Sequence, residues 1–447
     1  MAIQPKERLP ATAAAARARA LGALCYIERD GAGSQQALRS ALDLAPALTG
    51  PDRGLATELV YGVLRKRRGL DAWIGAASTH GLYKMQIEDL CALRLGAYQL
   101  AWLPRIPDFA AVHATVDAAR SMVSARSLGF IHAVLRRLAR EVAEGQRPDA
   151  PDLPPWIQRR IEAFALEVGQ DPAAMAEAFC QPAPMHVHVL AKDLDGEAAE
   201  ALRAEGVLLE PLEDIAIPGV WRSTGGGLFL SDAFAERRVV AQDAASVAVA
   251  EWLGVQPGEQ VVDVAAGRGI KSLALAVRGG VVTAIDLDAT KLESAAQLCA
   301  NAGYPLHATQ AADAAQDLGL APATFDRVLV DAPCSGLGTL RRRPEIRHRR
   351  RATDLVRMSV LQQAILNNAA ALCRPGGVLV FATCSFAPEE GPLVVDDFLR
   401  QHPEFHRDSG QQAWVAPLLD ARGDLRSHPL IGGMDAFYAA RLVRDAS

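Results

Sequence analysis

The chain has 447 residues, of which 50% are hydrophobic, and a formal net charge of -5. This length is enough for two or three domains, and the apolar content supports packed cores and excludes wholesale disorder. The charge is unevenly spread, because residues 1–147 carry a net +7 and the remainder carries -12. The asymmetry predicts that the N-terminal part helps to bind a polyanion.

The cysteines and the start of the chain indicate the compartment. The chain has 7 cysteines with no Cys-x-x-Cys motif, which also argues against a thiol redox enzyme. Arg17 and Arg19 interrupt the alanine-rich start, so it is a poor secretory signal. No apolar run is long enough to span a bilayer. We therefore expect a cytoplasmic protein without a membrane partner.

Residues 11 to about 144 carry only helical patterns. Apolar residues follow helical spacing around Leu59 and Leu135, and less cleanly around Leu95. Gly, Pro and Asp separate these segments. We predict a compact all-α domain over residues 1–147.

Two basic clusters, Arg65–Arg68 and Arg136–Arg140, are expected to end helices of this domain. Cations near a helix C-terminus are stabilised by the helix dipole. The same clusters are equally suited to a surface that faces RNA. Both interpretations stay open.

A proline-rich linker over residues 145–155 leads into a region of mixed pattern, and we predict a small α+β domain over residues 148–238. Helices are expected at Trp156–Val168 and Asp193–Glu205, and a strand at Met185–Leu190.

His186 and His188 alternate with valines, so they share one face of the expected strand. Two histidines can begin a metal site, but no further cluster of ligands is visible. We therefore predict a solvated strand face and no metal.

Strands and helices alternate from residue 239 to residue 447, which predicts a doubly wound, Rossmann-like α/β domain. A strand at Val261–Val264 leads through a loop of small residues into a helix at Ile270–Val277. The next strand ends in Asp286, and an acid at this place binds ribose hydroxyls in such folds.

The loop after the first strand lacks the full glycine motif of dinucleotide sites. Gly267 and Gly269 still let a ligand approach the backbone. Such a loop, followed by acids such as Asp286 and Asp313 at strand ends, suits adenosine without a pyrophosphate, as in S-adenosylmethionine. The predicted cofactor contacts are Ala265, Ala266, Gly267, Arg268, Gly269, Ile270, Lys271, Asp286, Asp313 and Asp331.

Two later strands end in loops that contain cysteine. Val328–Val330 leads into Asp331 and Cys334, and Val378–Thr383 leads into Cys384. A lone cysteine is more often a small buried hydrophobe, but both of these lie beside small polar residues at strand ends, where chemistry occurs in open α/β sheets. Two thiols and a carboxylate predict a reaction centre.

An arginine-rich run from Arg341 to Arg351 follows the first cysteine loop, with Glu345 as its only acid. A solvated face is the simpler interpretation, but this density of cations favours a phosphate backbone as the partner. The predicted RNA contacts are Arg341, Arg342, Arg343 and Arg347.

The cysteine loops at 331–336 and 383–385 resemble those of RNA cytosine-5 methyltransferases. Nearly the whole chain resembles the bacterial small-subunit ribosomal RNA methyltransferase B family (RsmB/Sun/Fmu), and its helical start resembles the NusB-like RNA-binding domain of that family at 58–65 and 129–136. The loop at 265–271 departs from the family's usual Cys-Ala-Ala-Pro-Gly-Gly-Lys, because the proline and one glycine are missing.

The resemblance implies S-adenosylmethionine-dependent methylation of carbon 5 of a cytosine in 16S ribosomal RNA. Cys384 would be the nucleophile that attacks carbon 6, and Cys334 would assist release of the adduct. Asp331 would hydrogen-bond the base near N3. Asp286 would hold the cofactor ribose, and Asp313 the adenine end. The target base would be single-stranded or flipped.

Two alternatives stay open. One is the same chemistry on another RNA, such as transfer RNA, since the NusB-like domain favours ribosomal RNA only by resemblance. The other is a catalytically weak RNA-binding factor in ribosome assembly, for which the altered cofactor loop is the support. We expect a monomer in either case.

Overall fold

The structure is a computed structural model that describes residues 13–78, 81–148, 151–190, 197–225 and 227–446. The chain divides into two compact units. Unit 1 comprises Met1–Ile157 and Arg343–Arg349, and unit 2 comprises Gln158–Arg342 and Arg350–Ser447. None of the described helices is long and apolar enough to cross a membrane.

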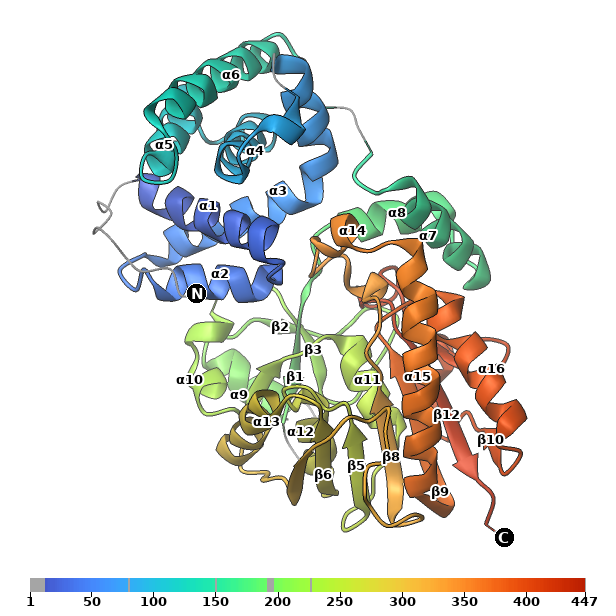
Figure 1. The fold of residues 1–447 in the computed structure, drawn as a ribbon. Coiled ribbons are helices and arrows are strands. Elements are labelled where there is room, and N and C mark those ends of the chain that lie inside the picture. Colours follow the sequence, from blue (N-terminus) through green and yellow to red (C-terminus); the bar gives the residue numbers. More distant parts are fainter. Residues whose placement is uncertain (1–12, 79–80, 149–150, 191–196, 226, 447) are drawn as a thin grey trace. The chain divides into compact units, whose positions relative to one another are not determined.

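Unit 1 is built from helices throughout its described residues, as predicted for the N-terminal region (Figure 1). Helix α4 packs against α1, α3, α5 and α6. All residues of α4 from Cys91 to Ala101 are buried, so α4 is the centre of this core. The elements of unit 1 are α1 (Ala13–Asp30), α2 (Ser34–Asp43), α3 (Gly50–Ala77), η1 (Leu82–Lys84), α4 (Ile87–Trp102), α5 (Asp108–Ala119), α6 (Ala125–Ala143) and α14 (Ile346–Arg349).

The central position of α4 explains why the apolar pattern around Leu95 is less periodic than those of its neighbours. A helix buried on all sides has no need of a polar face. The guanidinium of Arg94 is enclosed with it, at 3% exposure, and its Nε donates to Asp71 at 2.7 Å. Glu28 lies 3.4 Å from the same side chain. The pairing is necessary because an isolated buried charge is costly.

The basic segment Arg65–Arg68 does not end a helix, so this part of the prediction is wrong. The 28-residue helix α3 continues past the segment and ends at Ala77. Within α3, Lys66 forms an ion pair with Asp152 at 2.6 Å, and Arg67 forms one with Glu28 at 2.8 Å. These two cations therefore stabilise unit 1 internally.

The first part of unit 2 carries a four-stranded antiparallel sheet in the order β2-β3-β1-β4. The expected helix at 193–205 is observed as α9, and residues 191–196 lie outside the described residues. The boundaries 1–147, 148–238 and 239–447 stay predictions. The elements of this part are α7 (Pro155–Glu167), α8 (Pro172–Cys180), β1 (Met185–Val189), α9 (Glu197–Ala204), β2 (Leu209–Glu210), β3 (Val220–Ser223), η2 (Leu228–Leu230), α10 (Asp232–Ala235) and β4 (Val239–Ala241).

The prediction of a solvated face for His186 and His188 is wrong, because each is only 1% exposed. Both lie on β1, between β3 and β4. His186 Nε2 lies 3.0 Å from the carbonyl oxygen of Gly432, and its Nδ1 lies 3.1 Å from Asp243. His188 contacts Gln242 at 3.3 Å, and burial lowers its pKa to about 4. The described part of the chain holds no group of three or more His, Cys, Asp and Glu arranged for a metal ion.

The second sheet has eight strands, with the order β10-β12-β9-β8-β5-β6-β7 and β11 paired to β12. Strands β5 to β9 are parallel, and β12 runs antiparallel to β9. The strand order reverses between β5 and β8, which is the switch point where such sheets bind ligands. The strands are β5 (Gln260–Val264), β6 (Val281–Asp286), β7 (Ala308–Ala311), β8 (Phe325–Asp331), β9 (Cys373–Thr383), β10 (Phe405–Arg407), β11 (Leu425–Arg426) and β12 (Tyr438–Arg444).

Helices cover both faces of this sheet, as predicted for a Rossmann-like domain (Figure 1). On β9, Val378 and Val380 pack in the core that contains α11 and α12, while Leu379 and Phe381 pack in the core that contains α15 and α16. A strand buried on both faces requires a continuous apolar run. The helices are α11 (Ala244–Trp252), α12 (Ile270–Val277), α13 (Ala289–Asn301), η3 (Leu337–Thr339), α15 (Ala352–Leu372), η4 (Pro388–Glu390), α16 (Pro392–Gln401) and η5 (Ala413–Leu418).

Gly338, in η3, offers a test of how closely the loops pack at the end of β9. Its N–H donates to the carbonyl of Cys384 at 3.0 Å, and its own carbonyl accepts from Ala436 N at 3.1 Å. A Cβ at this position would lie 1.7 Å from the Ala436 oxygen. We expect Gly338→Ala to lower the free energy of unfolding by about 1–3 kcal/mol in urea denaturation of the full chain.

The matched control is Gly129→Ala on α6, where an added Cβ meets nothing within 4 Å. Alanine is favoured over glycine in a helix by up to about 1 kcal/mol, so this variant should be neutral or stabilising. A Gly338→Ala chain as stable as the parent would contradict the close approach of the two loops.

Candidate active site

The predicted site residues follow four neighbouring parallel strands. The loop 265–271 follows β5, Asp286 ends β6, Asp331 ends β8 and Cys384 directly follows β9. Because β5 lies between β6 and β8, and β8 lies beside β9, the carboxyl ends of these strands meet at one edge of the sheet. The sheet therefore brings together residues that are far apart in the sequence.

The two thiols meet at this edge. Cys334 Sγ lies 3.1 Å from Cys384 Sγ. The strand pairing reaches into the loops, because Ala332 N donates to the carbonyl of Ala382 at 2.9 Å. The hydrogen bond with Cys384, together with burial, raises the pKa of Cys334 well above its ordinary value. Cys334 is therefore held as a neutral thiol.

Lys271 connects the loop after β5 to the end of β8. Its Nζ donates to Asp331 Oδ2 at 2.6 Å and lies 5.3 Å from the ring centre of Phe437. Burial opposes the charge on Lys271, but Asp331, with smaller effects of Asp263 and Cys384, raises its pKa above the ordinary value. The side chain thus remains charged beside both Asp331 and Cys384. A contact between Lys271 and a cofactor stays a prediction.

The loop 265–271 has a backbone shape that leaves room for a ligand. Ala265 has φ 62°, a left-handed conformation that is strained for a residue with a Cβ. Gly267 has φ 59°, and an added Cβ there would meet nothing within 4 Å. The backbone at Gly267 is therefore open on the side where a ligand would approach.

Asp286 fixes the shape of this loop. It is 8% exposed, and its two carboxylate oxygens accept the N–H groups of Gly267 and Asp288, each at 2.9 Å. A carboxylate can accept further hydrogen bonds, so a ribose hydroxyl fits the same group. Asp313 lies just beyond β7, is exposed and accepts Ala315 N–H at 3.0 Å. The geometry suits the predicted cofactor, and the individual contacts stay predictions.

Asp263, on β5, lies directly before the loop. It is fully buried, and its Oδ2 accepts the Ser272 hydroxyl at 2.6 Å. Burial raises the pKa of Asp263 to about 7, and the charges of Asp331 and Asp286 act in the same direction. This carboxyl is therefore protonated across the mildly acidic range.

A buried glutamate that sequence reasoning did not assign joins the two cysteine loops. Glu390, in η4, has 0% exposure. Its Oε2 accepts the hydroxyls of Ser335 and Ser385, at 2.5 Å and 2.6 Å. Each of these serines directly follows one of the two cysteines. The repeated Cys-Ser pair was the signal in the sequence, but it does not indicate which acid the two serines share.

The arginine-rich run is divided between the two units. Arg341 and Arg342 belong to unit 2. Arg341 is 6% exposed and donates to the carbonyls of Pro182 and Gly433, at 3.1 Å and 3.2 Å. Arg342 forms an ion pair with Asp243 at 2.6 Å. A phosphate contact by either side chain would require these internal bonds to break.

Residues 343–349 belong to unit 1. Arg347 is 1% exposed and donates to the carbonyl of Arg65 at 3.4 Å. Arg349 donates to the carbonyl of Gly31 at 2.8 Å. Arg343 differs, because its side chain is 47% exposed. Among the four predicted RNA contacts, Arg343 is thus the one on the surface, and its role stays a prediction.

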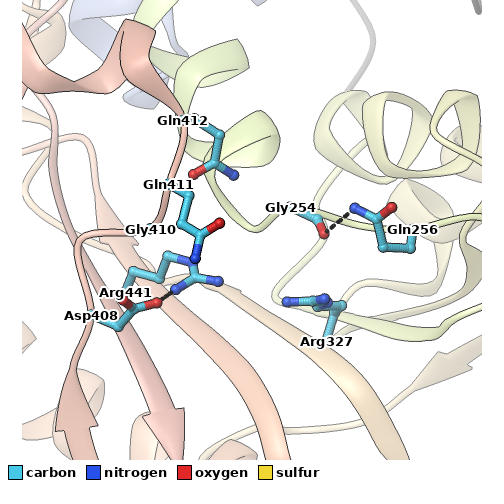
Figure 2. Close-up of a pocket in the computed structure, with 8 residues that line it drawn as sticks. All are labelled: Gly254, Gln256, Arg327, Asp408, Gly410, Gln411, Gln412 and Arg441. Carbon is cyan, nitrogen blue, oxygen red and sulfur yellow. Dashed lines mark hydrogen bonds and ion pairs between the residues drawn. The ribbon is translucent and has the colours of Figure 1, made fainter.

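A polar cavity of about 400 Å³ lies at the opposite end of the sheet (Figure 2). Arg327 lies near the start of β8, so the cavity is at the amino end of that strand. Arg327 is paired with Glu259 at 2.8 Å, and Arg441 is paired with Asp408. Both guanidinium groups in the cavity are thus paired with carboxylates. Its lining consists of Gly254, Gln256, Arg327, Asp408, Gly410, Gln411, Gln412 and Arg441.

Comparison with known proteins gives consistent matches over both units. Residues 250–443 match the 16S rRNA methyltransferase RsmB/F family, and residues 14–140 match the NusB family. The ribosomal RNA small subunit methyltransferase B of Thermus thermophilus is 35% identical, over 96% of this chain and 97% of its own. The protein of the same name from Vibrio cholerae is 32% identical, over 82% of this chain and 86% of its own. The crystal structure of PH0851 has the same fold, with a TM-score of 0.79 at 24% identity, over 98% of this chain and 100% of its own.

The protonation of Asp263 predicts a pH dependence of stability. Its pKa is about 7 in the folded chain against an ordinary 3.8, so between these values the folded chain binds a proton that the unfolded chain releases. The free energy of unfolding should therefore fall as the pH rises through this window, by on the order of 1 kcal/mol per pH unit. Asp263→Asn cannot titrate, and it should make that slope shallower in urea unfolding measured at several pH values. Part of the slope should remain, because burial also raises the pKa of Asp435 to about 7.

The control is Asp317→Asn, which changes an exposed carboxylate in the same unit and should leave the slope unchanged. A slope in Asp263→Asn equal to that of the parent chain would contradict a protonated Asp263.

Proposed function

Because the chain belongs to the ribosomal RNA small subunit methyltransferase B family, we propose that it transfers a methyl group from S-adenosylmethionine to carbon 5 of a cytosine in small-subunit ribosomal RNA. The observation that carries this proposal is the pair of thiols, Cys334 and Cys384, which lie 3.1 Å apart beside the Asp331 loop. Two converging thiols beside a carboxylate suit covalent activation of a pyrimidine.

The residues at the ends of β5 and β6 would hold S-adenosylmethionine, which supplies a methyl group on a positively charged sulfur. Gly267 provides open backbone, and Asp286 provides a carboxylate that is already fixed by two N–H groups. Asp313 would face the adenine end. These strand ends are neighbours of the ends of β8 and β9, where the thiols lie.

A covalent step is required because carbon 5 of cytosine is too electron-poor to take a methyl group directly. The Cys384 thiolate adds to carbon 6 and thereby makes carbon 5 nucleophilic. Asp331 hydrogen-bonds the base near N3 and stabilises the charge that the addition creates. Lys271 holds Asp331 in place through its 2.6 Å hydrogen bond.

Release of the product reverses the thiol addition. After methyl transfer, the proton on carbon 5 passes to solvent and the bond between carbon 6 and Cys384 breaks, so that Cys384 leaves as a thiolate and the aromatic ring is restored. Cys334 lies against Cys384 and assists this second step. The two thiols therefore act at different times, although they occupy one site.

The basic N-terminal region supplies RNA affinity. Residues 14–140 match the NusB family, and residues 1–147 carry a net +7. Arg136 and Arg140, on α6, are exposed and available for phosphate contacts. Since the base must reach a thiol at the edge of the sheet, the target is single-stranded or flipped out of its stack.

Substitution of each thiol in turn distinguishes the proposed roles of the two cysteines. Cys384→Ala should lower methylation by at least about a thousandfold and form no adduct, because the nucleophile is gone. Cys334→Ala should still attack and transfer the methyl group, and should then stall with protein attached to methylated RNA. The measurement is a denaturing gel of labelled small-subunit ribosomal RNA after incubation with each variant and S-adenosylmethionine.

Cys180→Ala is the control, since Cys180 ends α8 and belongs to neither cysteine loop, and this variant should turn over like the parent chain. A trapped band with Cys384→Ala but not with Cys334→Ala would mean that the roles are reversed. Full activity in both variants would contradict a covalent mechanism.

A further inference from the structure

Each of the two cysteines is followed by a serine whose hydroxyl points at one buried carboxylate. Ser335 Oγ and Ser385 Oγ donate to the same oxygen, Glu390 Oε2, at 2.5 Å and 2.6 Å. Glu390 Oε1 accepts the backbone N–H of Ser335 at 2.6 Å. A single side chain thus binds both loops at the residue next to each thiol.

Further hydrogen bonds fix this carboxylate to the sheet and to a helix. The Glu390 carbonyl accepts Thr383 Oγ1 at 2.9 Å, at the end of β9. Gln362 Nε2, on α15, donates to the carbonyl of Pro333 at 2.9 Å and lies 3.5 Å from Glu390 Oε1. The loop that contains Cys334 is therefore anchored on both sides of the thiol.

The free-energy cost of burying Glu390 indicates that this residue does more than fill space in the core. A buried carboxylate is costly unless hydrogen bonds replace its hydration. Here the donors are hydroxyl, amide and backbone N–H groups, and among the described residues no Lys, Arg or His forms an ion pair with Glu390. Its negative charge is thus left to act on its surroundings. The hydrogen bond with Cys384 and burial are the main causes of the raised pKa of Cys334, and the charge of Glu390 adds a smaller effect in the same direction.

We propose that Glu390 is a positioning residue that sets the separation of the two thiols through Ser335 and Ser385. The inference rests on the proposed function, because it assigns the two thiols different jobs. With Glu390 in place, the thiol of Cys334 stays beside Cys384, with the two sulfur atoms 3.1 Å apart. After methyl transfer the same thiol is in position for release.

Glu390→Gln removes the charge of this side chain and keeps its size and shape. The amide keeps an oxygen for Ser335 N–H and places an NH₂ group towards hydroxyls that can rotate to accept it. The negative charge is lost, so Cys334 should ionise more readily. We expect iodoacetamide to alkylate Cys334 about threefold faster or more near neutral pH, with its rate-against-pH curve shifted to lower pH. Peptide mass spectrometry of the full chain measures both cysteines separately, without RNA or cofactor.

Glu390→Gln should also slow the release step of RNA methylation. We expect kcat for RNA methylation to fall about tenfold or more, with KM for RNA unchanged and a covalent RNA–protein band that accumulates. The matched control is Glu389→Gln, which removes the neighbouring carboxylate from its ion pair with Arg160 at 2.6 Å and should change neither readout.

Ser335→Ala and Ser385→Ala provide a second route if Glu390→Gln fails to fold. Each variant removes one of the two hydroxyl hydrogen bonds to Glu390 and keeps the Glu390 charge. The covalent RNA–protein adduct should therefore accumulate, while the pH dependence of Cys334 alkylation should not change. Unchanged alkylation and unchanged kcat in Glu390→Gln would overturn the proposal, as would serine variants with parental turnover. A parent chain that methylates no RNA would instead refute the proposed function, while the alkylation measurements would still test Glu390.

Discussion

The parallel pairing of β8 with β9 is the constraint on which the site depends. Val330 is in register with Phe381, and Asp331 with Ala382, so both strands end at the same level. Cys334 and Cys384 are 50 residues apart in the sequence, yet they meet at 3.1 Å because their loops leave the sheet side by side. A shift of one residue in this register would turn the strand side chains to opposite faces and would separate the thiols. The continuous apolar runs that bury both faces of β9 therefore also help to bring the two thiols together.

The two thiols have buried charged neighbours of opposite sign. Lys271 donates to Asp331 at 2.6 Å, and Cys384 is among the groups that stabilise its ammonium charge. Glu390 lies on the side of the serines and helps to raise the pKa of Cys334. Electrostatic interactions are stronger for buried charges such as Lys271 and Glu390 than for exposed ones. Under the proposed function, these surroundings suit two thiols that act at different steps.

Much of this arrangement could be predicted from the sequence, because strand ends are readable from apolar runs that stop at polar residues. Val328–Val330 before Asp331 is such a run. Features that depend on tertiary contacts were not readable. The burial of His186 and His188 depends on partners more than fifty residues away, Asp243 and Gln242. The density of arginines in 341–351 is similarly ambiguous, since a guanidinium can bind a phosphate or the carbonyls of its own chain, as Arg341 does. The role of Glu390 was hidden for the same reason.

Bisulfite sequencing of small-subunit ribosomal RNA after incubation with the purified chain and S-adenosylmethionine tests the proposed reaction most directly. Methylation at carbon 5 protects a cytosine from conversion, so we expect a protected cytosine that is absent when Cys384→Ala replaces the parent chain. Labelled methyl groups in the RNA without any protected cytosine would contradict methylation at carbon 5, and a cytosine that Cys384→Ala still protects would contradict the covalent role of that thiol.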